Sequence, residues 1–180
     1  MLKCPRSPHI VCPRDVNNEK KKVAYKPARG SRKRAGTRLV LVNHQRGVRV
    51  DTSLLRRIGV LALPHCSNKR GEFKSVLSSL SVVEVAIVSD AVISAVHRQF
   101  LNGDSSTDVI TFPYGEVVIS AETASFNSGF YGHSPTIEIA FCLIHGLLHL
   151  SGYSDHTTLQ ADKMKRRQIR ILKWCIKNCR

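Results

Sequence analysis

The sequence contains no apolar run that approaches the roughly 20 residues needed to cross a bilayer. Its first residues, M-L-K-C-P-R-S-P, carry charge but no following apolar stretch, so we expect no secretory signal. The six cysteines include no C-x-x-C pair, which argues against a disulfide scaffold and against a cysteine-based zinc module. These absences favour a single-domain protein in a reducing cytoplasm, with no membrane partner.

Acidic side chains are scarce: 13 Asp and Glu stand against 28 Lys and Arg, a formal net charge of +15. Residues 1–36 alone hold 11 of the basic and 2 of the acidic residues. A positive field of this size favours polyanionic partners, nucleic acid first and an anionic membrane surface second. The alternative is a solvated basic surface that binds nothing.

Residues 1–36 also contain four prolines and few large apolar side chains. Such a segment cannot bury enough surface to offset its chain entropy, so we expect a disordered basic N-terminal extension there. This extension could contact phosphates, act as a targeting peptide, or lie upstream of the true start codon. One folded domain is expected over residues 37–180.

Hydrophobic periodicity over the rest of the chain predicts its elements. Apolar β-branched runs predict strands at residues 39–42, 82–88, 108–112 and 116–120. Helical spacing and capping residues predict helices at residues 51–63, 90–100, 134–150 and 158–177. The fold class is therefore α/β (α+β): a small mixed sheet packed by helices, in a single compact domain.

The last apolar helix carries a candidate metal site at its end. His145 and His149 are four residues apart, so their imidazoles lie one turn apart on one helix face. Gly152 allows the chain to leave the helix in a left-handed conformation and to turn back. A third ligand from beyond Gly152 would then complete a catalytic zinc site, which takes three protein ligands and keeps one position open.

A zinc peptidase is the first alternative for such a histidine pair. The H-E-x-x-H motif of those enzymes supplies its general base as the Glu after the first His. Position 146 is Gly here, so the sequence argues for a hydrolytic metal but against peptidase chemistry.

Three motifs together resemble the YbeY family of rRNA maturation factors, which are viewed as metal-dependent, single-strand-specific endoribonucleases. Residues 145–153, H-G-L-L-H-L-S-G-Y, match the family pattern H-G-x-L-H-L-x-G-Y-D-H without a gap. Residues 107–113, T-D-V-I-T-F-P, resemble the block T-D-V-L-S-F-P, and residues 115–120, G-E-V-V-I-S, resemble G-D-I-V-I-S. The resemblance is collinear and covers residues 38–177.

The resemblance implies a compact α/β fold with one zinc ion per chain on three histidines. It further implies a zinc-dependent, single-strand-specific endoribonuclease that acts in maturation of the 3′ end of small-subunit rRNA and in ribosome quality control. The partners would be single-stranded RNA, ribosomal RNA and the small ribosomal subunit. The alternative function is a non-catalytic ribosome-assembly factor that binds RNA and whose zinc is structural.

The third ligand is open between two residues, because the chain has S-D-H where the family has D-H. We expect His156, since the Asp-His pair is retained and a loop can absorb one extra residue. Asp155 is the alternative ligand, because strict counting places it at the family position and a carboxylate also binds zinc. If His156 is the ligand, Asp155 becomes a second-shell or acid–base catalytic group, or caps the final helix.

Candidate RNA contacts come from three places. Many relatives carry arginine where this chain has Leu101, and Arg98, one helical turn earlier, is the candidate catalytic replacement. The basic face of the final helix offers phosphate contacts through Lys163, Arg166, Arg167 and Arg170. Unpaired bases could stack on Phe112, Tyr114 or Tyr153, although Phe112 also fits a core position.

Overall fold

The computed structural model describes residues 36–67, 73–101 and 107–179, without the side chain of Leu101. The predicted extension over residues 1–36 therefore lies almost wholly outside the described residues. Four strands form one sheet in the order β1-β2-β4-β3, with bounds Arg38–Asn43 (β1), Val82–Val88 (β2), Val109–Phe112 (β3) and Glu116–Ser120 (β4). β1, β2 and β4 are parallel, whereas β3 pairs antiparallel with β4 across a tight turn.

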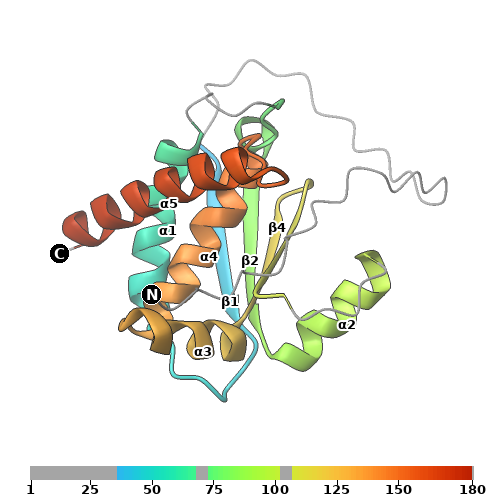
Figure 1. Cartoon of the computed structure of the whole chain (residues 1–180), viewed down its shortest axis with the longest axis vertical. Coiled ribbons are helices and arrows are strands. Elements are labelled where there is room, and N and C mark those ends of the chain that lie inside the picture. The colour runs from blue at the N-terminus through green and yellow to red at the C-terminus, as the bar shows by residue number, and fades with distance from the viewer. Residues whose placement is uncertain (1–35, 68–72, 102–106, 180) are drawn as a thin grey trace.

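Five α-helices accompany the sheet in the described residues, together with a short 3-10 turn at Leu77–Ser79. Their bounds are Thr52–Cys66 (α1), Asp90–Leu101 (α2), Ala121–Tyr131 (α3), Pro135–Leu150 (α4) and Thr158–Asn178 (α5). α1 and α4 pack on one face of the sheet, and α5 crosses over both of them (Figure 1). α2 contacts β3 and β4, on the opposite face of the sheet. The expected mixed sheet packed by helices is confirmed.

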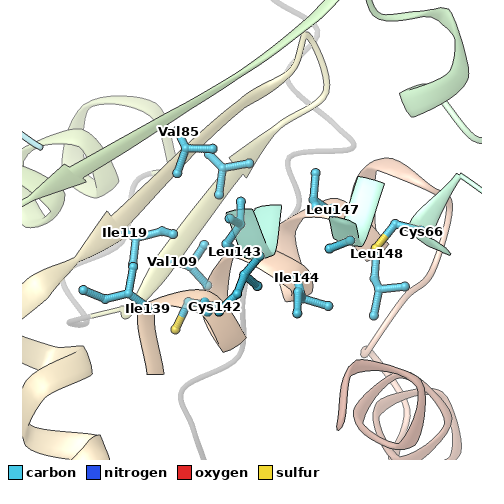
Figure 2. Close-up of a cluster of buried hydrophobic side chains, with 14 of the residues drawn as sticks. Cys66, Val85, Val109, Ile119, Ile139, Cys142, Leu143, Ile144, Leu147 and Leu148 are labelled. Carbon is cyan, nitrogen blue, oxygen red and sulfur yellow. The ribbon is translucent and has the colours of Figure 1, made fainter. Parts of the chain in front are cut away.

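Most of the core lies between the sheet and α4. Alternate residues of β2 and β4, such as Val85 and Ile119, point toward α4, as expected for strands. Ile139, Leu143 and Leu147 of α4 meet them and are fully buried (Figure 2). A smaller cluster beneath α2 consists of Val88, Ile93, Ile110, Phe112 and Val118.

Two glycines fix how α4 sits. Gly146 lies against the sheet, and a Cβ there would come within 2.8 Å of Thr111 Oγ1 and of Val117 Cγ1. Only glycine therefore lets the helix approach β3 and β4 this closely. Gly152 has φ +88°, and a Cβ there would lie 2.2 Å from the carbonyl oxygen of Phe73. The predicted left-handed exit from α4 is confirmed.

Candidate metal centre

His145 and His149 come together at the C-terminal end of α4. Their rings meet edge to face with centroids 4.6 Å apart, and their Nε2 atoms are 2.8 Å apart. Both side chains are shielded, that of His149 being 3% exposed and that of His145 15%. The helix spacing that predicted the pair thus also aims the same nitrogen of each ring at one point.

The other nitrogen of each ring has its own acceptor. Gln168 of α5 donates its amide hydrogen to the Phe141 carbonyl at 2.8 Å, which leaves its Oε1 to accept from His145 Nδ1 at 3.4 Å. His149 Nδ1 donates to the Tyr153 carbonyl at 3.2 Å. Because each Nδ1 faces an oxygen acceptor, each ring carries a hydrogen on Nδ1, and the Nε2 atoms of the two rings face each other.

At 2.8 Å the two Nε2 atoms are close enough to share one cation, either a proton or a metal ion. Burial, reinforced by His149, lowers the pKa of His145 to about 3, so this imidazole is in the neutral form that binds metals. In both rings Nδ1 faces an oxygen acceptor and Nε2 points to the common centre, as in metal-binding histidines in general.

Asp155 supplies the third donor. After Gly152 the chain turns back, Tyr153 and Ser154 pack inside, and Asp155 is the next residue to reach the pair. Its Oδ2 lies 3.7 Å from His145 Nε2 and 3.8 Å from His149 Nε2. The ligand atoms of these three residues lie within 4.8 Å of one another, and no other such group occurs in the described part of the chain. Two imidazoles and one carboxylate fit zinc.

His156 lies outside this group. Its side chain is exposed, and its backbone N–H donates to Ser154 Oγ at 3.4 Å. Of the two candidates for the third ligand, the structure thus brings Asp155 to the histidines and leaves the expected His156 in solvent. The physical reason is that Tyr153 and Ser154 are both buried in the turn without a bulge, so Asp155, three residues after Gly152, reaches the histidines as the strict count places it.

A line of polar side chains continues from the histidines toward the start of α4. Cys142 lies one turn before His145 and its thiol donates to Asp108 Oδ2 at 3.8 Å. Burial raises the pKa of Asp108, and burial together with Asp108 raises the pKa of Glu138 to about 7. Glu138 Oε2 lies 3.1 Å from His133 Nε2. Cys142 is buried and contacts Asp108 of this acidic pair.

The predicted RNA-contacting residues are dispersed. Arg98 is exposed on α2, across the sheet from the histidines, and it makes no recorded contact with them. Lys163, Arg166 and Arg170 are exposed along α5. Arg167 is half-buried, and its Nη2 donates to the His65 carbonyl at the end of α1 at 2.8 Å. Arg167 therefore ties α5 to the negative end of the α1 dipole.

Among the candidate aromatic residues, only Tyr114 presents its ring to solvent. Tyr114 is 62% exposed and stacks on Phe112, which is 5% exposed and belongs to the core beneath α2. Tyr153 is 8% exposed and contributes its carbonyl to the histidine site.

Gln168 was missed by the sequence analysis, although one signal pointed to it. It occupies the buried stripe of α5 together with Met164, Ile171 and Cys175, where an unpaired amide would be costly. A polar residue at a core position of an amphipathic helix predicts a specific partner, which here is His145.

The fold and the donor set define an α+β protein with three residues at the end of its central helix that could hold a metal ion. The sequence matches the family described as Endoribonuclease YbeY over residues 43–175. The chain belongs to this family, as the sequence resemblance indicated.

Individual relatives agree with this assignment. The Endoribonuclease YbeY of Carboxydothermus hydrogenoformans is 33% identical over 141 residues, which cover 73% of this chain and 93% of the relative. That of Helicobacter pylori strain J99 is 41% identical over 101 residues, which cover 52% of this chain and 69% of the relative. The solution structure of TM1509 from Thermotoga maritima matches with a TM-score of 0.54 at 23% identity, over 79% of this chain and 90% of that one. This likeness supports the fold. No helix in the described residues has the length and apolar character of a membrane span.

Proposed function

We propose that this chain is a zinc-dependent endoribonuclease that cleaves single-stranded RNA. The observation that carries the proposal is the pair of imidazoles whose Nε2 atoms converge beside the Asp155 carboxylate. His145, His149 and Asp155 would hold one zinc ion per chain. When bound, zinc supplies a Lewis acid that stabilises negative charge on phosphoryl oxygens and lowers the pKa of a coordinated water.

The residues around the ligands have positioning tasks in this proposal. Gln168 and the Tyr153 carbonyl hold the two rings in the ligating tautomer. In this proposal Asp155 acts as a ligand, and the acid–base role belongs to the alternative in which His156 binds the metal. Arg98 is proposed only as a distant phosphate contact, because α2 lies on the other face of the sheet.

The basic face of α5 supports RNA as the substrate. This helix carries seven Lys or Arg residues and a single Asp, and Lys163, Arg166 and Arg170 are exposed on it. Exposed cations along one element are the usual contacts for a phosphate backbone. We extend the proposal to maturation of the 3′ end of small-subunit rRNA and to ribosome quality control in the cytoplasm, on the strength of family membership.

A non-catalytic assembly factor with a structural zinc is the alternative. Structural zinc sites are closed by a fourth protein ligand, whereas catalytic sites keep that position open. The group found in the described residues has three members, which favours the enzyme.

The test is to purify the protein without chelator and to measure zinc per chain and cleavage of single-stranded RNA. Wild type and His156→Ala should retain about one zinc per chain, and His145→Ala and Asp155→Ala should lose both zinc and cleavage. Zinc bound by wild type without any cleavage would favour the assembly factor. Loss of zinc in His156→Ala with retention in Asp155→Ala would restore His156 as the third ligand.

A further inference from the structure

A groove between α1 and α5 lies outside the metal centre and has an unusual lining. Its deeper part, about 400 Å³, is bounded by Arg56, Arg57, Val60, Leu61, Asn178 and Cys179. Next to it the Trp174 indole packs against the His65 imidazole, with ring centroids 4.1 Å apart and planes tilted by 55°. Asn178 of the lining lies one helical turn after Trp174 on α5, and its amide donates to the Trp174 backbone carbonyl at 2.7 Å.

Trp174 remains accessible in this position. The residue is 41% exposed, although tryptophan normally buries most of its surface. The Arg167 hydrogen bond to the His65 carbonyl fixes α5 against the end of α1, so the aromatic pair is part of the packed scaffold. The groove therefore offers a preformed aromatic surface that needs little ordering on binding.

The cations around Trp174 indicate the charge of the ligand. Arg170 lies four residues before Trp174 and Lys177 three residues after it, so both share its side of α5. Arg56 and Arg57 line the groove from α1, and all four of these cations are exposed. An aromatic side chain with two cations on its own side of α5, followed along the groove by two arginines of α1, suits a ligand that alternates flat rings with phosphates.

We propose that this groove binds a segment of single-stranded RNA, with a base stacked on Trp174 and flanking phosphates on Arg170, Lys177, Arg56 and Arg57. Base stacking on aromatics combined with a positive groove is the general way in which proteins bind single strands without reading sequence. The proposal rests on RNA as the substrate proposed above, and it adds a contact surface separate from the metal centre.

The single tryptophan of the chain makes this proposal directly measurable. The full-length, zinc-loaded protein is titrated with a non-cleavable 2′-O-methyl oligouridylate of about eight nucleotides, a length within the usual site sizes for single strands. We expect saturable quenching of the tryptophan fluorescence that weakens as salt is raised.

Matched variants distinguish RNA binding in the groove from general attraction by the positive charge of the protein. Arg170→Gln combined with Lys177→Gln should weaken binding roughly ten-fold, while Lys165→Gln combined with Lys173→Gln, which removes the same charge elsewhere on α5, should change it less than about two-fold. Trp174→Leu, followed by fluorescence anisotropy of a labelled oligonucleotide, should also weaken binding roughly ten-fold. Phe126→Leu is its control, an aromatic position on α3 that is more exposed than Trp174, 69% against 41%.

The outcomes are distinct from those of the nuclease test. RNA cleavage by wild type without any quenching would overturn the groove and leave the nuclease standing. Quenching in a protein that cleaves nothing would support the groove and count against the nuclease. Equal losses in the two charge variants would overturn the proposal. So would a blue shift of the emission on phosphatidylglycerol vesicles without any response to RNA, which would identify a membrane-contacting face.

Discussion

The chemistry of this protein depends on a few residues that fix one another. Each histidine of the pair presents Nε2 because an oxygen acceptor holds its Nδ1, and for His145 that acceptor is the Gln168 amide of another helix. The spacing of the histidines was predictable from the sequence, since it follows from helix geometry. Their acceptors and the third ligand were not, because a loop conformation and an interhelical contact are set by packing that no local pattern encodes.

Gln168 should control metal affinity without being a ligand. Gln168→Leu removes the acceptor that orients His145, and loss of such an outer partner typically lowers metal affinity about 10–100-fold. The measurement is competition for zinc against a colorimetric chelator, together with the thermal unfolding midpoint. Gln168→Glu, which retains an acceptor oxygen, should recover part of the affinity. Equal zinc affinity in wild type and Gln168→Leu would show that the tautomer is set by something else.

Gly146 should be intolerant of any side chain. In Gly146→Ala the new methyl group would press on Thr111 and Val117, and overpacking of this kind typically costs about 1–3 kcal/mol. Denaturant unfolding measures the difference. Gly129→Ala is the control, because a Cβ there meets nothing within 4 Å and alanine favours helix by up to about 1 kcal/mol. An unchanged free energy of unfolding in Gly146→Ala would contradict the close approach of α4 to the sheet.

At the scale of elements, α4 contributes residues both to the hydrophobic core and to the candidate metal centre. Periodicity predicted this helix within a residue of its bounds, and β2 was predicted with its observed bounds, because both have strong apolar patterns. The pattern predicts no element at α3, Ala121–Tyr131, and this was wrong. Its sequence mixes small and polar residues with a glycine, and Phe126 and Phe130 point outward, so it lacks an apolar stripe.

The acidic pair of Asp108 and Glu138 should make the stability of the fold depend on pH. The pKa of Glu138 is raised from 4.5 to about 7, so the folded protein holds a proton that the unfolded chain releases. This contribution to stability is complete below pH 4.5 and is lost as pH rises to about 7. Asp108, whose pKa is also raised, acts in the same direction.

The corresponding measurement is the free energy of unfolding at about pH 5 and at about pH 8. Between these two pH values, wild type should lose about 1–3 kcal/mol more stability than Glu138→Gln. Glu84→Gln, which changes an exposed carboxyl group on β2, should follow the wild-type profile. Parallel profiles for wild type and Glu138→Gln would contradict the assignment of the raised pKa to this carboxyl group.

On the scale of the whole molecule, the dominant property is the net charge of +15. Composition alone predicted a polyanionic partner, and the structure shows how part of that charge is arranged, with seven basic residues on α5 and two arginines on the adjacent face of α1. The sequence could not reveal that Arg167 takes part in helix packing while the basic residues near it on α5 are exposed. All of them are cationic residues of one helix, and their local sequences do not distinguish them.

RNA affinity should accordingly depend steeply on ionic strength. Each phosphate contact with a single strand contributes about 0.7 to the slope of log affinity against log salt concentration. Arg170→Gln combined with Lys177→Gln should reduce that slope by about 1.4 relative to wild type. Titrations of the labelled oligonucleotide at several salt concentrations provide the slopes. Unchanged slopes would mean that these two cations do not contact phosphates.

The central claim is that His145, His149 and Asp155 hold a zinc ion. The most direct measurement is anomalous diffraction from crystals of the native protein at the zinc absorption edge. The account predicts one peak per chain about 2.0–2.2 Å from both Nε2 atoms and from an Asp155 carboxylate oxygen, with no fourth protein ligand. No peak at this position, or a peak coordinated by His156 in place of Asp155, would contradict it.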